Sequence, residues 1–398
     1  MSVTHPLGFR AAGVAAGLRR NGAPDLGLLV ADGPCSMAGL FTTNRLAAAP
    51  VIIGRDRIAS GAPRAILVNS GQANAATGER GLADAEASVA AAAAHLGLEP
   101  GEVVPSSTGV IGEPLHMAEM LTALPGLVGA LDRAGGPTFA RAIMTTDTVD
   151  KQATAGAGDH RVGGCAKGVG MISPNLATML AFVTTDAEVA ASDLRRLAAE
   201  QLAPRFHALT VDASTSTNDT VLLIASGAAG RGPVVPGTKP WDALGAAVGE
   251  VGESLLRQLA ADAEGVTHVL LVEVRGAASE HDARAAAKAV ADSPLVKTAA
   301  FGGDPNPGRI LQAVGAAGVP VDPARVDVRI GDVVVAAGGV IPPEYFDETG
   351  DLHTAARAAM KEPEIRITVS LGAGTSGSRA VGCDLSHDYV RINGEYTT

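Results

Sequence analysis

Residues 167–187, KGVGMISPNLATMLAFVTTDA, contain two different kinds of sequence that meet at one threonine, Thr178. The first half contains Gly168, Gly170 and Pro174, which disfavour a regular helix and indicate a turn. The second half, MLAFVTT, is short, apolar and partly β-branched, as a buried strand is. Thr178 is therefore predicted to lie where a turn becomes a strand. The simplest interpretation is that its hydroxyl satisfies a backbone amide of the turn.

Strand and helix patterns alternate on both sides of this segment. Short apolar runs predict strands at 64–71, 221–227 and 268–276. Spaced apolar residues among charges predict helices at 81–97, 116–132, 187–203, 241–263 and 281–291. This alternation is typical of an α/β protein.

The last third of the chain is richer in strand patterns. VDVRIGDVVVAAGG carries a Gly331-Asp332 turn between two alternating segments, and EIRITVSLG and YVRING are further strand candidates. We expect a smaller, strand-rich part from about residue 303 to residue 398, and GGDPNPGR at 302–309 is a candidate boundary.

Composition narrows the class of protein. A chain of 398 residues and 39.8 kDa can form two domains, and with only 3% aromatic residues its core must be built from Ala, Val, Leu and Ile. The formal charge of −11 argues against nucleic acid or an anionic membrane as a partner. The N-terminal segment lacks an apolar signal core, so we expect a soluble, cytoplasmic protein.

The three cysteines, Cys35, Cys165 and Cys383, stand far apart and show no ligand spacing. This pattern fits a reduced compartment and predicts neither a disulfide framework nor a metal site. Cys165 is either a small core residue or a nucleophile.

Familiar catalytic motifs are absent from the sequence. It contains no HExxH and no GxSxG, and no glycine-rich phosphate loop in a strand-to-helix context. Five hydroxyl-rich or glycine-rich segments instead flank apolar runs: FTTNR at 41, NSGQANAATG at 69, SSTGVIG at 106, MTTDT at 144 and DASTSTNDT at 212. Strand ends are where α/β proteins bind ligands, and Thr108 and Gly109 offer a hydroxyl and an amide to a developing oxyanion. Taken alone, SSTGVIG is explained more simply by a plain turn with satisfied hydroxyl groups.

Several motifs in fixed order resemble one family. KGVGMISPNLATML, SSTGVIG, AIMTTDT, VNSGQANAATG, DAEG and the C-terminal YVRINGEYTT are similar to the ornithine acetyltransferase family, also called glutamate N-acetyltransferase, of arginine biosynthesis. The similarity extends from CSMAGLFTTNR at 35 to the last residue. It implies an αββα sandwich-like catalytic core with a smaller C-terminal α/β domain.

The resemblance also implies self-cleavage between Ala177 and Thr178. This would give an alpha chain of residues 1–177 and a beta chain of residues 178–398, assembled as α2β2. Thr178 would then be the nucleophile that carries acetyl from N-acetyl-L-ornithine to L-glutamate by ping-pong kinetics. The released α-amine, with an ordinary pKa of about 7.7 to 8.0, can act as the base.

The resemblance assigns roles to further residues. Thr108 and Gly109 match the oxyanion hole of the family. Its substrate-contacting positions are matched by Thr145, Lys167, Thr178, Glu264, Asn393 and Thr398. No cofactor is expected, although acetyl-CoA is a further candidate donor. Lys167 suits a substrate carboxylate and Glu264 a substrate ammonium, although either can equally be a surface ion pair.

The chain departs from the family pattern at two places. It has DPNPGR, with Pro307, where the family usually has tryptophan, and it ends in Thr398 where relatives can carry serine. Two other functions are left open by the sequence. One is a self-processed amidase or aminopeptidase, which would pass the acyl group to water. The other is an uncleaved metabolite-binding protein.

Overall fold

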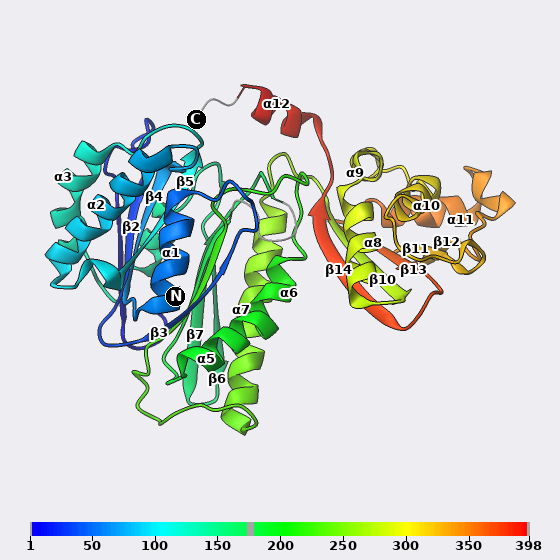
Figure 1. The fold of residues 1–398 in the computed structure, drawn as a ribbon. Helices are drawn as coiled ribbons and strands as arrows, with labels where there is room; N and C mark the ends of the chain where they lie inside the picture. The colour runs from blue at the N-terminus through cyan, green and yellow to red at the C-terminus, as the bar shows by residue number, and fades with distance from the viewer. Residues whose placement is uncertain (1, 173–178, 396–398) are drawn as a thin grey trace. The chain divides into compact units, whose positions relative to one another are not determined.

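A computed structural model describes residues 2–172 and 179–395 (Figure 1). The chain forms two compact units. Among the described residues, the first contains those up to His207 together with Ser214–Leu259, and the second contains Ala208–Ala213 together with residues 260–395.

Two sheets form the centre of the first unit. One has the order β1-β2-β4-β5 and consists of β1 (Phe9–Val14), β2 (Leu26–Ala31), β4 (Ala65–Gln72) and β5 (Val103–Val110). The other has the order β3-β9-β8-β7-β6 and consists of β3 (Ser36–Phe41), β6 (Lys151–Ala157), β7 (His160–Lys167), β8 (Leu180–Thr185) and β9 (Thr220–Ala225). The predicted strands at 64–71 and 221–227, and the apolar run after Thr178, are therefore confirmed.

Helices pack against these two sheets (Figure 1). They are α1 (Ala49–Ser60), α2 (Gly78–Leu96), α3 (Met117–Gly129), α4 (Gly136–Ala142), α5 (Ala191–Leu197), α6 (Ala203–Phe206) and α7 (Lys239–Ala261), with a 3₁₀ turn η1 (Pro100–Glu102) and a π-helical turn η2 (Ala198–Leu202). Helices α2 and α3 pack on the first sheet, where Val89 and Leu124 join Leu28 in one buried cluster. Helix α7 packs on the second sheet, where its Val251 side chain lies against Gly164 of β7.

The inner faces of the two sheets pack against each other. Phe9 and Val68 of the first sheet share a buried cluster with Phe182 and Leu222 of the second. Cys165 belongs to the same cluster, and burial raises the pKa of its thiol. These layers confirm the expected αββα sandwich, and Cys165 is a core residue rather than an exposed nucleophile.

The second unit is an α/β domain with one sheet. Its strands, in the order β12-β11-β13-β10-β14, are β10 (Val269–Ala277), β11 (Asp327–Ile330), β12 (Val333–Ala336), β13 (Glu364–Ser370) and β14 (Ser376–Cys383). Its helices are α8 (Glu280–Asp292), α9 (Pro294–Gly302), α10 (Pro307–Gly315), α11 (Asp351–Ala359) and α12 (His387–Glu395), with 3₁₀ turns η3 (Pro323–Arg325) and η4 (Pro343–Phe346). The segment GGDPNPGR joins α9 to α10 inside this unit, and Pro307 is the first residue of α10.

The prediction of a strand at YVRING was wrong, because this segment lies in helix α12. Valine and isoleucine alternate there with polar residues, which gives a strand-like period. Helical spacing satisfies the polar groups instead: Asn393 Nδ2 donates to the Tyr389 carbonyl at 3.1 Å, and Arg391 Nε lies 3.0 Å from Asp388 Oδ1. Contacts at i,i+3 and i,i+4 are those of a helix surface.

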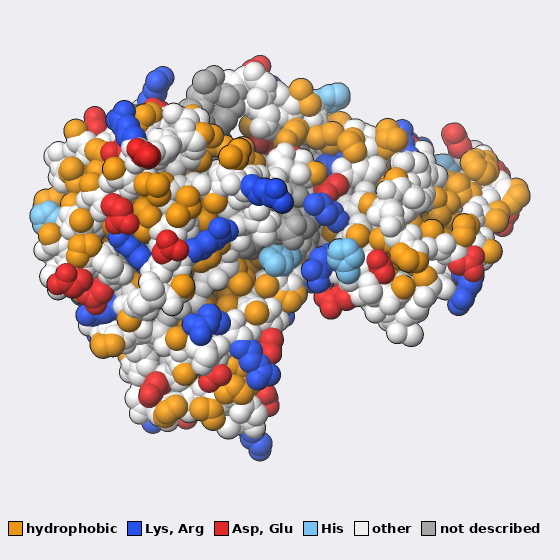
Figure 2. All heavy atoms as spheres, viewed as in Figure 1, with side chains coloured by type: hydrophobic (Ala, Val, Ile, Leu, Met, Phe, Trp, Pro, Cys, Tyr) orange, Lys and Arg blue, Asp and Glu red, His pale blue; other side chains and the backbone are white. Residues whose placement is uncertain are grey.

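None of the helices that the structure describes combines the length and the hydropathy needed to span a bilayer. Acidic and basic side chains are interspersed on the face shown in Figure 2. That face therefore shows no patch of a single sign.

Two glycines face each other where strands β4 and β5 end. The strands pair in parallel, with Gly71 opposite Gly109, and the backbone φ angles of these residues are 148° and 132°. A Cβ atom added to Gly109 would lie 2.1 Å from the Gly71 carbonyl oxygen. Only glycine fits here, because both the space and the backbone angle exclude a side chain.

We therefore expect Gly109→Ala to lower the free energy of unfolding by at least about 1–3 kcal/mol, the cost of one strained residue, with backbone displacement adding to it. Urea unfolding of the purified protein measures this. Gly101→Ala is the matched control, since Gly101 lies just before β5 and an added Cβ there meets no atom within 4 Å. Equal stability of the two variants would contradict the steric argument.

Candidate active site

Hydroxyl groups are concentrated at the carboxyl ends of β4 and β5, but most serve the fold. Ser70 Oγ donates to the Ala142 carbonyl at 2.8 Å, and Ser107 Oγ donates to Asn69 Oδ1 at 2.6 Å. Thr108 stands opposite Ser70 in the strand pairing and is also buried. Its hydroxyl differs from these two because it contacts a charged side chain.

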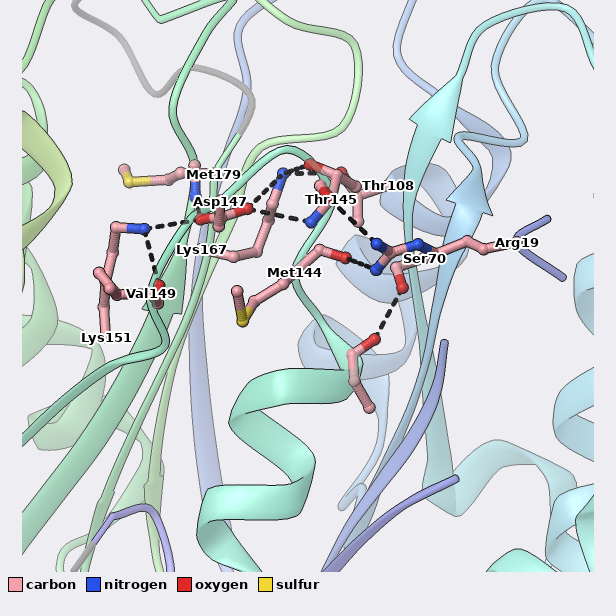
Figure 3. Close-up of polar contacts among 12 residues, drawn as sticks. Arg19, Ser70, Thr108, Met144, Thr145, Asp147, Val149, Lys151, Lys167 and Met179 are labelled. Atoms are coloured by element: carbon pink, nitrogen blue, oxygen red, sulfur yellow. Dashed lines mark hydrogen bonds and ion pairs between the residues drawn. The ribbon is translucent and has the colours of Figure 1, made fainter. Parts of the chain in front are cut away.

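That side chain is Lys167, the last residue of β7. Lys167 Nζ donates to Thr145 Oγ1 at 2.7 Å and to Thr108 Oγ1 at 3.2 Å, and the lysine is only 2% exposed (Figure 3). The sequence placed these three residues in separate motifs, and the fold brings them together. A hydroxyl that accepts a hydrogen bond from an ammonium group becomes a better donor itself. The geometry thus prepares Thr108 to donate to a third group.

The carboxylate of Asp147 accepts hydrogen bonds from several members of this cluster. Its Oδ1 accepts from Lys151 Nζ at 2.8 Å and from the Gly168 amide at 2.8 Å, while its Oδ2 accepts from the Thr145 amide at 3.0 Å. Lys167 Nζ lies 3.9 Å from Oδ2. One carboxylate therefore positions both Thr145 and the chain that follows Lys167.

The charge of Asp147 is well compensated. Burial raises the pKa of its carboxyl group, but the ammonium groups of Lys167 and Lys151, together with the hydrogen bonds, outweigh burial and lower the pKa to about 2. Asp147 is therefore ionised at neutral pH although its side chain is buried. Sequence reasoning selected the MTTDT segment but missed the roles of Asp147 and Lys151. Their separation by four residues in the sequence was the one indication that they could form an ion pair.

Arg19 supports the same loop from another direction. Its guanidinium donates to the carbonyls of Met144 and Thr145 at 2.7 and 3.2 Å (Figure 3). Its own amide donates to Asp25 Oδ2 at 2.8 Å, and Asp25 is fully buried. These bonds fix the backbone of Thr145, and nothing in the local sequence around Arg19 indicates them.

Ala177 and Thr178, the proposed scissile pair and nucleophile, lie outside the described residues, as does Thr398. The residues on either side of this gap are described. Lys167 pairs with Leu180 across β7 and β8, and the Met179 amide donates to Asp219 Oδ1 at 3.2 Å. The pairing keeps the start of β8 beside the end of β7, where the Lys167 cluster lies.

Glu264 and Asn393 are brought together within the second unit. Asn393 Nδ2 donates to Glu264 Oε2 at 2.9 Å, although 129 residues separate them in the sequence. Gly265 permits this approach: its φ is +68°, and a Cβ there would lie 2.4 Å from the Tyr389 amide nitrogen. This pair offers a carboxylate oxygen and an amide at one place. The roles of both residues in binding substrate remain predictions.

Removal of the Asp147 charge tests the electrostatic centre of the cluster. We expect Asp147→Asn to lower the free energy of unfolding by about 3–5 kcal/mol at pH 7, since it leaves buried lysines without their carboxylate. The folded-state pKa of about 2 lies below the ordinary 3.8, so the wild-type contribution is complete above about pH 4 and is lost as the pH falls towards 2.

Urea unfolding of wild type and variant at pH 7 and at pH 3 measures this difference. The gap between the two proteins should be smaller at pH 3. Asp159→Asn is the control, because Asp159 is exposed in the β6–β7 turn and its replacement should change little at either pH. A loss that is the same at both pH values would contradict the ion-pair explanation.

Comparisons with known proteins agree with this architecture. The ArgJ family model matches residues 10–398. An arginine biosynthesis bifunctional protein ArgJ from Symbiobacterium thermophilum is 46% identical over 402 aligned positions, which cover 100% of this chain and 98% of the relative. Its counterpart from Thermus thermophilus is 45% identical and is covered completely, as is this chain.

A solved structure is also similar. The crystal structure of an arginine biosynthesis bifunctional protein argJ from Bacillus halodurans is 38% identical, with a TM-score of 0.50, and the match covers 54% of this chain and 98% of that one. The family model and the full-length relatives agree in identity and coverage. The chain belongs to the ArgJ family.

Proposed function

We propose that this protein is a self-cleaving acetyltransferase of arginine biosynthesis, which moves acetyl from N-acetyl-L-ornithine to L-glutamate through an acetyl-enzyme on Thr178. Membership of the ArgJ family supports the reaction class. The observation that carries the proposal is the contact of buried Lys167 with Thr108 and Thr145, at the end of the strand that pairs with the start of β8.

The proposed transfer has two half-reactions. In the first, the Thr178 hydroxyl oxygen attacks the acetyl carbonyl carbon while the Thr178 α-amine takes the hydroxyl proton. The oxyanion that forms is held by the Thr108 hydroxyl and the Gly109 amide. Its collapse breaks the bond to the ornithine nitrogen, which receives the proton from the α-amine. In the second half-reaction, the glutamate amine attacks the threonine ester and regenerates the hydroxyl.

Self-cleavage uses the same threonine hydroxyl on the protein's own backbone. The Thr178 hydroxyl attacks the Ala177 carbonyl carbon and the peptide C–N bond breaks, which gives an ester and frees the Thr178 α-amine. Water then hydrolyses the ester, which releases the Ala177 carboxylate and restores the hydroxyl. The small side chain of Ala177 leaves room for this attack.

The sheet supports a cut that does not separate the two pieces. Residues 162–167 of β7 lie upstream of the cut and pair with 180–185 of β8 downstream. Strand β3 at 36–41 likewise pairs with β9 at 220–225. Hydrogen bonds and a shared core would thus hold the two pieces together after the cut. This fits the proposed α2β2 assembly of two cleaved chains, which we expect in the cytoplasm.

Recognition of the substrates rests on the charged side chains. Lys167 suits the substrate carboxylate, with Thr145 beside it, and Glu264 suits the substrate ammonium, with Asn393 as its neighbour. N-acetylornithine carries a carboxylate and a side-chain ammonium, whereas glutamate carries carboxylates and the amine that attacks the ester. Acetyl-CoA stays a second candidate donor, and no cofactor is required by the steps above.

Processing and transfer are tested together with Thr178→Ala. Scaling 39.8 kDa by chain length, we expect wild type to give pieces of about 18 and 22 kDa, with the heavier one beginning at Thr178, while the variant stays whole because it lacks the hydroxyl. Intact-mass analysis and N-terminal sequencing measure this. Thr154→Ala, at an exposed position of β6, is the control that should be cut normally.

The cleaved wild type should form N-acetylglutamate from N-acetylornithine and glutamate, with little free acetate when glutamate is omitted. Acetate release that does not depend on glutamate would favour the amidase or aminopeptidase alternative. An intact wild-type chain without transfer would favour a metabolite-binding protein. Replacement of N-acetylornithine by acetyl-CoA shows whether the second donor is accepted.

A further inference from the structure

Arg19 brings a second positive charge to the cluster around Thr145. Its guanidinium group donates to the Met144 and Thr145 carbonyls at 2.7 and 3.2 Å, while Lys167 Nζ donates to the Thr145 hydroxyl at 2.7 Å. Figure 3 shows the two basic side chains reaching Thr145 from different sides. All of these residues belong to the first unit and are described. A guanidinium group and an ammonium group therefore meet at one residue.

No carboxylate forms an ion pair with the Arg19 guanidinium group within residues 2–172 and 179–395. Arg57 shows the other arrangement, because it donates to the Val103 carbonyl and also pairs with Glu86. A guanidinium group has five N–H donors in a planar fork, and Arg19 uses two of them for the carbonyls. Its charge and its other donors are thus available to an anion that enters the site.

The backbone of Arg19 is held by buried groups. Asp25 is fully buried, and its carboxylate accepts from the Arg19 amide at 2.8 Å and from the Ala16 amide at 2.6 Å. Gln72 Nε2 donates to the Leu18 carbonyl at 2.9 Å. With its backbone and its guanidinium group both fixed, Arg19 loses little conformational freedom when it binds a ligand.

The two proposed substrates differ in the charge of their side chains. Each carries an α-carboxylate, which suits Lys167, but N-acetylornithine has a side-chain ammonium group where glutamate has a second carboxylate. Glu264, which suits the ammonium group, would repel that carboxylate. Glutamate therefore needs a separate positive group, and Arg19 supplies one next to the contact between Lys167 and Thr145.

We infer that Arg19 determines specificity for glutamate in the second half-reaction, because its guanidinium group binds the side-chain carboxylate of glutamate beside Lys167. This inference rests on the proposed function. Guanidinium and carboxylate groups match in a bidentate geometry, and such charge-assisted bonds are stronger than neutral ones. Arg19 transfers no proton in the reaction. It orients glutamate so that the amine can attack the ester, and it selects against acceptors that lack the second carboxylate.

Arg19→Gln tests the inference, and Arg20→Gln is the matched control, since Arg20 is an exposed neighbour with the same charge. Glutamine can still donate to a backbone carbonyl but carries no charge. In ping-pong kinetics the kcat/KM of each substrate reports its own half-reaction. We expect Arg19→Gln to lower kcat/KM for glutamate by at least about tenfold, mainly through KM, while kcat/KM for N-acetylornithine stays within about threefold of wild type. The control should change neither value.

The choice of acceptor gives a second readout. L-Glutamine has the length of glutamate but a neutral side chain, so wild type should prefer glutamate, and Arg19→Gln should lose at least about tenfold of that preference. Arg19→Lys keeps the charge without the fork and should recover part of the preference. An arginine with only a structural role would not change this ratio.

An equal loss of kcat/KM for both substrates in Arg19→Gln would overturn the inference, as would an unchanged preference for glutamate over glutamine. Intact-mass analysis and thermal unfolding show whether the variant is cut and folded. If it is not, the same comparison is made with Arg19→Lys, where a loss confined to glutamate supports the inference and a loss shared with N-acetylornithine overturns it. If wild type itself transfers no acetyl from N-acetylornithine, the proposed function fails and this inference fails with it.

Discussion

The pairing of β7 with β8 is the constraint on which the proposed site depends. The chain leaves the sheet at Lys167 and returns opposite it at Leu180, so both ends of the intervening segment are fixed by the same antiparallel pairing. Both strands are buried between the facing sheet and helix α7. The segment with the proposed scissile bond is therefore anchored at both ends, and the pairing persists if the chain is cut.

The charged side chains at the end of β7 are buried, so hydrogen bonds and ion pairs stabilise their charges in place of water. Asp147 bridges Lys151, the Thr145 amide and the Gly168 amide, while Lys167 contacts the hydroxyls of Thr145 and Thr108. The local dielectric is low here, so each of these interactions is stronger than it would be at the surface. The same cluster can favour a developing negative charge without rearranging, which is what acyl transfer requires.

The sequence predicted those helices and strands whose pattern of apolar residues is contained within one short segment. Apolar runs located β4, β8, β9 and β10, and spaced apolar residues located α2, α3, α7 and α8. YVRING was misassigned because alternation over six residues resembles a strand, whereas its polar groups are satisfied at helical spacing. A second, smaller unit was expected, but its membership was not, since Ala208–Ala213 joins it only through the fold.

Contacts between segments that are far apart in the chain could not be predicted from the sequence. The resemblance named Thr108, Thr145 and Lys167, and the structure shows that they touch. Asp219 lies in the DASTSTNDT segment, which was noted for its hydroxyl groups, but its bond to Met179 spans 40 residues and depends on the parallel pairing of β8 with β9. Such partners follow from sheet topology, which composition and periodicity do not specify.

Capture of the acetyl-enzyme tests the proposed function most directly. Purified, cleaved protein is incubated with N-acetylornithine in the absence of glutamate, quenched in acid and examined by intact-mass analysis and peptide mapping. The proposal predicts one added acetyl group on the fragment that begins at Thr178, held as a hydroxylamine-sensitive ester on its first residue and lost when glutamate is added. Formation of N-acetylglutamate without any acetylated fragment would contradict the covalent mechanism.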